Sequence, residues 1–295
     1  MIIVKLWGGM CNQMFQYAFG YALAKKYGDE LAFDIDFFEN QPSQVGKREV
    51  ISTNDFALTR LKFAKRPGLV KIFENRYLNH LLRYNTGCEF TARKVHFFLE
   101  KHFKHYKNVP YKANLINYYD GYWQSSLYSD FCHEELIREF TPTKSVVEKV
   151  SSWKESLSRS NLVAVHVRRG DYLNKINTKT IEDVVSGPAY YMRAVEYMKK
   201  HVEQPTFCFI SDDIEWCKNQ FGDRIENAVF VENVGKDAAI IDLFTMAACD
   251  HEIMSPSTFS WFGNWLRDSN KESIIVCPKV YEPSRKVVMS HWIEL

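Results

Sequence analysis

Two adjacent arginines follow a predicted buried strand in the segment HVRRGDY, residues 166–172. In an open parallel sheet, ligands bind outside the carboxyl ends of the strands, which is where this segment leaves its strand. A guanidinium offers five donors in a planar fork suited to a phosphate or diphosphate, and Asp171 can orient one of the two. Alternation places His166 and Arg168 on one face of the strand and Arg169 on the other. Anion binding is therefore favoured over a structural Arg–Asp pair that closes a loop.

A second anion site is predicted where the segment SPSTFSWFGNW, residues 255–265, opens a helix after a short strand. Ser257 or Thr258 would cap this helix, and its free backbone N–H groups would attract a phosphate. The alternative is an ordinary capped helix whose aromatic side chains anchor it in the core. From these residues alone, the alternative is favoured, because capping residues stand at most helix starts.

The segment GGMCNQMFQY, residues 8–17, is a glycine turn between a first predicted strand and a first helix. It lacks the third glycine of the G-x-G-x-x-G fingerprint, and no acidic residue clearly occupies the usual ribose position, which argues against a nicotinamide cofactor. Asn12, Gln13 and Gln16 place amide groups at the end of the strand, facing a crevice. Capping of the helix by Asn12 is an equally good interpretation.

Several carboxylates could also carry chemistry. Asp34 and Asp36, in the segment LAFDID, have a spacing that could hold a divalent metal for a nucleotide-sugar enzyme. The pattern is short and occurs often by chance, so a strand end and turn are favoured over a metal site. Asp212 and Asp213 form a second pair, and Asp242 lies within an apolar helical stripe. A carboxylate in that setting needs a partner such as the amine of a base.

Short apolar runs alternate with segments of helical length in the second half, which is typical of a parallel sheet covered on both faces. The first half begins with the same rhythm, but residues 40–120 lack clear periodicity, and helices are placed there only loosely. A polar segment near residues 145–160 predicts the boundary between two domains, 1–155 and 156–295. The predicted strands of the second half are 162–167, 206–211, 228–233, 251–255 and 273–278. The predicted helices are 189–201 and 237–249.

Composition limits the class of protein. With 295 residues, 46% hydrophobic and 25% charged, the chain should fold throughout, and its net charge of +2 gives no general attraction for nucleic acid or membrane. Residues 93–112 interleave basic and aromatic side chains, but a solvated face or an acceptor-side wall is favoured over nucleic-acid or membrane binding. No run of about 18 apolar residues occurs, and the sequence begins with a predicted strand, so neither a membrane span nor secretion through a signal peptide is expected. Seven scattered cysteines without a C-x-x-C pair argue against a disulfide framework or a zinc site, so a reducing cytoplasm is expected.

Five segments, in chain order, resemble the motifs of the alpha-1,2-fucosyltransferase family, glycosyltransferase family 11. They are GGMCNQMFQY (8–17), GYWQSSLY (121–128), HVRRGDY (166–172), SDDIEWCK (211–218) and DLFTMAACDHEIMSPSTFSWFGNWL (242–266). The arginine motif is similar to one shared with alpha-1,6- and protein O-fucosyltransferases. The chain departs from the family at Cys11, where glycine is usual, and at Pro256 and Phe262, where asparagine and tryptophan are common.

The resemblance implies an α/β, GT-B-like architecture with two Rossmann-type domains facing each other across a cleft. Residues 1–155 would form the acceptor-side domain and residues 156–295 the domain that binds GDP-fucose. The implied reaction is an inverting transfer of L-fucose to a terminal galactose hydroxyl of an oligosaccharide, without an obligatory metal or other cofactor. A lipid-linked acceptor would bring the cytoplasmic enzyme to a membrane surface. The alternatives are a metal-dependent transferase that uses another nucleotide sugar and a nucleotide- or glycan-binding protein without turnover.

The resemblance also implies roles for individual residues. Arg168 and Asn12 would be catalytic, Arg168 by neutralising the donor diphosphate and Asn12 by its place near the sugar. Asp242 would hydrogen-bond the guanine. The remaining donor-binding residues would be His166, Arg169, Asp171, Ser257, Thr258 and Phe259, with Asp34, Asp36 and Gln124 on the acceptor side. The general base stays open among Asp34, Asp36 and several histidines, or a dissociative route that needs no base.

Overall fold

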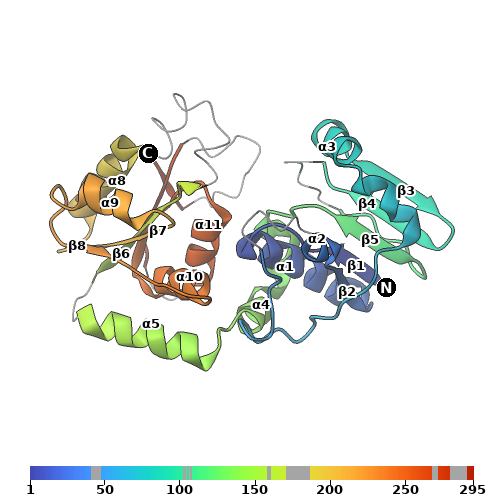
Figure 1. Cartoon of the computed structure of the whole chain (residues 1–295), viewed down its shortest axis with the longest axis horizontal. Coiled ribbons are helices and arrows are strands. Elements are labelled where there is room, and N and C mark those ends of the chain that lie inside the picture. Colours follow the sequence, from blue (N-terminus) through green and yellow to red (C-terminus); the bar gives the residue numbers. More distant parts are fainter. Residues whose placement is uncertain are drawn as a thin grey trace. The chain divides into compact units, whose positions relative to one another are not determined.

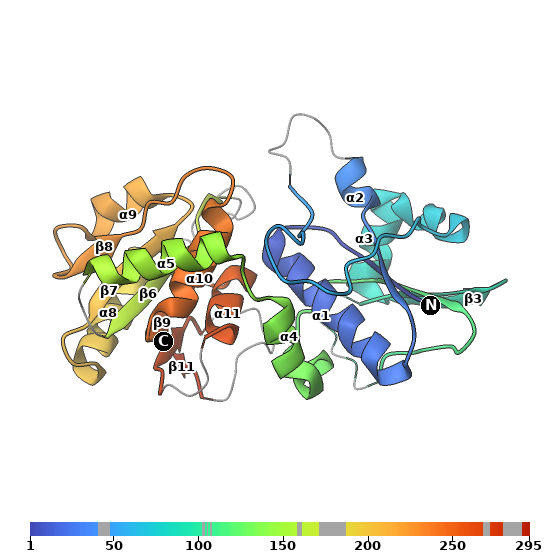
Figure 2. The ribbon, with the colours of Figure 1, turned by 90° about the horizontal axis from the view of Figure 1, so that it is seen from below.

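The computed structural model describes residues 1–40, 48–101, 104, 106, 108–157, 161–170, 187–267, 272–279 and 291–295. They form two compact units, Met1–Thr141 and Pro142–Leu295, whose elements are labelled in Figure 1. The units meet ahead of the predicted boundary at 155/156. Helix α5 (Lys144–Leu157), which spans that boundary, lies in the second unit because it packs against α10 (Ala238–Ala248), as Figure 2 shows.

The first unit contains a five-stranded sheet with the order β2-β1-β5-β4-β3, parallel except for the β3–β4 pair. Its strands are β1 (Ile2–Lys5), β2 (Leu31–Asp34), β3 (Cys88–Ala92), β4 (Val95–Leu99) and β5 (Ile116–Asp120). Its α-helices are α1 (Met10–Tyr27), α2 (Asp36–Glu39), α3 (Arg76–Asn85) and α4 (His133–Glu139), and its 3₁₀ turns are η1 (Gly68–Glu74), η2 (Ser126–Tyr128) and η3 (Asp130–Cys132).

Helix α1 lies close against the sheet because residue 20 is glycine. A Cβ on Gly20 would lie 2.9 Å from Leu31 Cδ1 and 3.0 Å from Val4 Cγ2, on the first two strands. The N-cap residue of this helix is Gly9. The interpretation of Asn12 as the capping residue is therefore wrong. Asn12 is instead a residue of the first helical turn.

Strands β3, β4 and β5, as well as helix α3, lie in the region where only loosely placed helices were expected. The apolar pattern is interrupted there by buried polar residues. His96 on β4 and Asn117 on β5 are fully buried, and His96 Nδ1 lies 3.1 Å from Asn117 Oδ1. Each satisfies the other across the strand pair, so the strands form without the continuous apolar run that would have predicted them.

The second unit contains a six-stranded sheet with the order β11-β10-β9-β6-β7-β8, in which every pair is parallel. Its strands are β6 (Leu162–Val167), β7 (Thr206–Ser211), β8 (Ala228–Phe230), β9 (His251–Ile253), β10 (Ile275–Cys277) and β11 (Ile293–Glu294). Besides α5 and α10, its helices are α8 (Pro188–His201), α9 (Ile214–Phe221) and α11 (Thr258–Trp265).

Both faces of this sheet are covered, as the alternation of strands and helices predicted. Val163, Val165 and Val167 of the central strand β6 pack with buried residues of α8 and α9. On the opposite face, His166 reaches Ser260 of α11, and α10 contacts β6. Among the described residues, no helix combines the length and the apolar character needed to cross a membrane.

Candidate active site

The predicted anion-binding segments meet at one place in the second unit. The chain passes from β6 to β7 and β8 on one side and then returns to β9 on the other side of β6. Ligands of parallel α/β sheets bind at such a topological switch point, outside the carboxyl ends of the strands. The arginine pair follows β6, and the segment that opens α11 follows β9. The two segments, which are far apart in the sequence, therefore lie beside one another at the carboxyl ends of β6 and β9.

Each arginine is oriented by a carboxylate that follows β7. Arg168 Nη1 lies 2.8 Å from Asp212 Oδ2, and Arg169 Nε lies 3.0 Å from Asp213 Oδ2. The Arg169 backbone N–H also donates to Asp212 Oδ1 at 2.9 Å, and its guanidinium carbon lies 3.8 Å from the centre of the Trp216 ring. The sequence presented Asp212 and Asp213 only as an acidic pair. A prediction that β6 and β7 are adjacent would have placed these two carboxylates beside Arg168 and Arg169.

Gly170 is required for this close approach. A Cβ at residue 170 would lie 2.5 Å from Asp212 Oδ2, so a larger residue would displace the carboxylate that orients Arg168. Asp171, which was expected to orient one guanidinium, lies outside the described residues.

His166 is a buried link between β6 and α11. Its Nδ1 lies 2.5 Å from Ser260 Oγ and 2.9 Å from Ser255 Oγ, and its ring centre is 5.3 Å from that of Phe259. Burial, helped by the charge of Arg168, lowers the pKa of His166 to about 3, so the imidazole is neutral at physiological pH. The contacts of His166 with Ser255 and Ser260 hold the loop that precedes α11 against β6.

The start of α11 combines both interpretations that the sequence allowed. Ser257 caps the helix, because its hydroxyl accepts a hydrogen bond from the Phe259 backbone N–H at 3.2 Å. Thr258 is the first helical residue. The helix also carries three buried aromatic anchors, which are Trp261, Phe262 and Trp265. Anchors and cap together hold the N-terminal N–H groups of α11 at the switch point.

Asp242 lies on α10 with an amide partner that the sequence did not predict. Asn233 donates to Asp242 Oδ1 through its Nδ2 at 2.7 Å. Burial raises the pKa of Asp242 to about 6, although the hydrogen bond from Asn233 opposes the shift. Half-burial leaves part of the carboxyl group able to meet a ligand.

The first unit has its own switch point, between β1 and β5. Gln124, which follows β5, donates to Asn12 Oδ1 at 2.9 Å, so two predicted site residues are neighbours. Gln13 and Gln16 were expected to face a crevice, and this is wrong, because both are fully buried. Gln13 donates to Glu49 O and accepts from the Ile51 N–H, each at 2.9 Å, while Gln16 bonds the Trp7 backbone.

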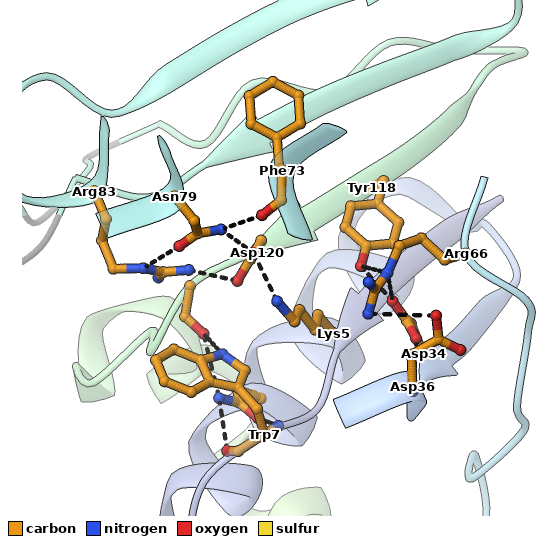
Figure 3. Close-up of polar contacts among 12 residues, drawn as sticks. Lys5, Trp7, Asp34, Asp36, Arg66, Phe73, Asn79, Arg83, Tyr118 and Asp120 are labelled. Atoms are coloured by element: carbon orange, nitrogen blue, oxygen red, sulfur yellow. Dashed lines mark hydrogen bonds and ion pairs between the residues drawn. The ribbon is translucent and has the colours of Figure 1, made fainter. Parts of the chain in front are cut away.

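Asp34 and Asp36 share an arginine, as Figure 3 shows. Asp34 has no exposed surface; its Oδ2 accepts from Arg66 Nε at 2.6 Å and from the Tyr118 hydroxyl. Arg66 Nη2 lies 3.7 Å from Asp36 Oδ2. The guanidinium thus stands where a cation would sit between the carboxylates. Within the described ranges, no group of three or more histidine, cysteine, aspartate or glutamate side chains could hold a metal ion.

A second buried network at this edge was missed by the sequence analysis. Asp120, at the end of β5, lies 2.6 Å from Arg83 Nη2 and 3.1 Å from Lys5 Nζ, and it accepts from Asn79 at 3.2 Å (Figure 3). Burial alone would raise the pKa of Asp120, but the charges of Arg83 and Lys5 hold it below its ordinary range.

Glu100, which follows β4, is the third acidic residue of this edge. Its Oε2 accepts from the backbone N–H groups of Tyr122, at 2.6 Å, and Trp123, at 3.1 Å. Burial raises the pKa of Glu100 to about 7. The parallel strands β2, β4 and β5 each end at or beside an acidic residue, and this repeated strand-end pattern could have indicated the network from sequence.

Comparisons with known proteins identify the family of the chain. The model of glycosyl transferase family 11 matches residues 1–290. The chain is 27% identical to an alpha-1,2-colitosyltransferase of Escherichia coli, over 90% of this chain and 88% of the relative. It is 26% identical to the O-antigen biosynthesis glycosyltransferase WbnK of Escherichia coli, over 98% of both chains. It is 23% identical to the galactoside alpha-(1,2)-fucosyltransferase 2 of Mus musculus, over 88% of this chain and 66% of the relative.

Solved structures show the fold. The fucosyltransferase NodZ from Bradyrhizobium superposes with a TM-score of 0.58 at 12% identity, covering 90% of this chain and 93% of that one. POFUT1 in complex with GDP gives 0.54 at 12% identity, covering 93% and 97%. Both neighbours are GT-B fucosyltransferases, so the α/β, GT-B-like prediction is confirmed. Because the family model spans nearly the whole chain, this protein belongs to glycosyl transferase family 11 and is a glycosyltransferase.

Proposed function

We propose that this enzyme transfers L-fucose from GDP-fucose to a terminal galactose hydroxyl of an oligosaccharide, with inversion, to form an alpha-1,2 linkage. The mouse relative is named a galactoside alpha-(1,2)-fucosyltransferase, and NodZ has been soaked with GDP-fucose. The observation that carries the proposal is that Arg168 and Arg169 follow β6 while the start of α11 follows the adjacent strand β9, at the switch point. That place suits the diphosphate of a nucleotide sugar.

A second donor is supported by a specific finding. The relative at 27% identity is an alpha-1,2-colitosyltransferase, so the nucleotide-activated form of colitose is the alternative to GDP-fucose. Both proposals share the same linkage and the same diphosphate chemistry. Competition between the two donors for one acceptor would distinguish them, with fucose transfer expected to dominate.

In the proposed reaction, the second unit stabilises the leaving group. Arg168 neutralises the diphosphate, on which negative charge develops as the bond to the sugar breaks. Asp212 holds Arg168 in place beforehand, so little reorganisation is needed during the reaction. The N–H groups at the start of α11, with Ser257, Thr258 and Phe259, meet the phosphates, and Arg169 and Asp171 support them. His166 holds the loop before α11 through its contact with Ser255.

The remaining parts of the proposal concern recognition. Asp242 accepts hydrogen bonds from the guanine base, and Asn12 lies near the transferred sugar with Gln124 beside it. Asp36 keeps 30% of its side chain exposed, whereas Asp34 is committed to Arg66, so Asp36 is the member of that pair able to reach an acceptor. We propose that the enzyme acts in the cytoplasm and meets a membrane surface only through a lipid-linked acceptor.

The first experiment is a calorimetric titration of the purified protein with GDP in excess EDTA. We expect GDP to bind, and UDP and NAD to bind far more weakly, because Asp242 reads the guanine and no obligatory metal joins the diphosphate to the protein. Absence of GDP binding under EDTA, or a preference for UDP or NAD, would contradict the proposed donor site. Binding that returns only when Mg²⁺ or Mn²⁺ is added would favour a metal-dependent transferase.

The affinity for GDP should depend on pH through Asp242. Its pKa of about 6 means that the carboxylate takes up a proton below neutrality and can no longer accept two hydrogen bonds from guanine. We expect the Kd for GDP to rise about tenfold between about pH 8 and about pH 5. Asp242→Asn should bind GDP about tenfold more weakly at about pH 8 and show little of this pH dependence.

The matched control is Asp223→Asn, which alters an exposed carboxylate of the same unit. This variant should keep the affinity and the pH dependence of the unmodified enzyme. Equal pH profiles for Asp242→Asn and the unmodified enzyme would show that another group controls GDP binding.

A further inference from the structure

An aromatic pair stands at the switch point of the first unit, outside the donor machinery. Trp7 follows β1, Tyr122 follows β5, and their ring centres are 4.1 Å apart with 43° between the planes. Phe37, after β2, meets Trp7 edge-on at 6.5 Å. Trp7 and Tyr122 are only half-buried, although most aromatic residues of this unit belong to its core.

The pair is held rigidly. The Trp7 N–H donates to Gln16 Oε1 at 2.9 Å, and Trp7 O accepts from Gln16 Nε2 at 3.3 Å. The indole Nε1 donates to Gly121 O at 3.2 Å, and Glu100 fixes the next backbone N–H groups, beginning with Tyr122. Both rings are thereby fixed to α1 and to the segment after β5. A surface aromatic held in this way loses little conformational entropy when a ligand packs on it.

Arg83 packs behind the pair. Its guanidinium carbon is 4.9 Å from the Trp7 ring centre and 5.8 Å from that of Tyr122, and its side chain is 5% exposed. Asp120 and Asn79 satisfy Nη2 and Nε (Figure 3). Nη1, however, is buried without a hydrogen-bond partner in the part of the chain that the structure describes. A buried charged donor without an acceptor is costly, so holding the guanidinium against the rings lowers the stability of this unit.

We infer that Trp7 and Tyr122 form a saccharide-stacking subsite, on which a hexose ring of the acceptor packs. The C–H face of a pyranose is apolar and weakly positive, and it complements the negative face of an aromatic ring. Arg83 packs against both rings from the protein side and holds their orientation. Arg83 is in this sense a positioning residue for the rings. The inference depends on the proposed function only for the identity of the sugar as the galactoside acceptor.

The first test measures saccharide binding without any donor. Saturation-transfer NMR with lactose should show transfer to the ring protons of its galactose in the unmodified protein. Trp7→Ala and Tyr122→Ala should each weaken lactose binding about tenfold, and Trp7→Phe should retain most of it. Tyr77→Ala is the control, because Tyr77 is an aromatic residue of the same unit that is 90% exposed and lies outside the pair.

The second test separates the subsite from the donor site. Trp7→Ala should raise the KM for the acceptor about tenfold while leaving the KM for the donor and the calorimetric Kd for GDP unchanged. Unchanged GDP affinity shows that the second unit is folded, and thermal unfolding of the variant checks the fold of the first unit, which carries Trp7. Equal lactose binding by Trp7→Ala and the unmodified protein, or no lactose binding by either, would overturn the subsite even if GDP binds. Lactose binding that depends on Trp7, in a protein without fucose transfer, would retain the subsite and refute the proposed function.

Discussion

Replacing Arg168 by alanine is expected to lower kcat by about a thousandfold and to leave the fold intact. The side chain lies at the carboxyl end of β6 and is 34% exposed, and its Nη1 is paired with Asp212. In the proposed reaction it faces a diphosphate that acquires charge as it departs, so most of its contribution should arise in the transition state. Its loss should therefore reduce kcat more than it raises the KM for the donor.

Arg168→Lys restores the charge but not the planar fork, and it should recover only part of the lost rate. Arg193→Ala, which removes an exposed arginine from α8, is the control and should turn over normally. Steady-state kinetics with GDP-fucose and a galactoside, together with thermal unfolding of each variant, would measure these effects. Near-normal turnover by Arg168→Ala would refute the assignment of Arg168 to the diphosphate.

The arrangement at the β6/β9 switch point, which is the proposed donor side, could be predicted because its signals are local in sequence. The run before Arg168, the proline that starts α8 and the cap at Ser257 each fix their own element within a few residues. Their convergence follows from the rule that parallel strands present their carboxyl ends on one edge. The partners of these residues are not local, and so Asp212, Asp213 and Asn233 could not be assigned from sequence alone.

The first unit was less predictable for a physical reason. Polar residues such as His96 and Asn117 lie inside its sheet, where they satisfy one another, and they remove the periodicity that identifies strands. Asp34 and Asp120 are also buried polar residues at the strand ends of this sheet. Asp34 is a candidate metal ligand or base in the sequence, and Asp120 was not singled out, but each is paired with an arginine from a distant segment, Arg66 or Arg83. The acidic strand ends can be seen in the sequence, but their arginine partners come from distant segments and are assigned only by the fold.

The second large effect concerns the buried ion pair between Arg267 and Glu252, which fastens the end of α11 to β9. Arg267 Nη2 lies 3.0 Å from Glu252 Oε2, and the two side chains are 3% and 0% exposed. Arg267 also donates to the backbone carbonyl of Cys249. Burial raises the pKa of Glu252 to about 7, although Arg267 opposes the shift. Because the folded-state pKa lies above the unfolded value, the contribution of Glu252 to stability is present below the unfolded pKa and is lost as pH rises through about 7.

Arg267→Met should lower the free energy of unfolding by about 3–5 kcal/mol at about pH 8, where it leaves Glu252 buried without its counter-charge. Near about pH 5 the loss should be smaller, because the Glu252 carboxyl stays protonated in the folded protein. The double variant Glu252→Leu with Arg267→Met should recover much of the loss, since no uncompensated charge remains. Urea unfolding at both pH values measures the effect, with Arg224→Met as an exposed control in the same unit. An equal loss at the two pH values, or a double variant no more stable than Arg267→Met, would show that the lost carbonyl contacts of Arg267, rather than the ion pair, hold α11 to β9.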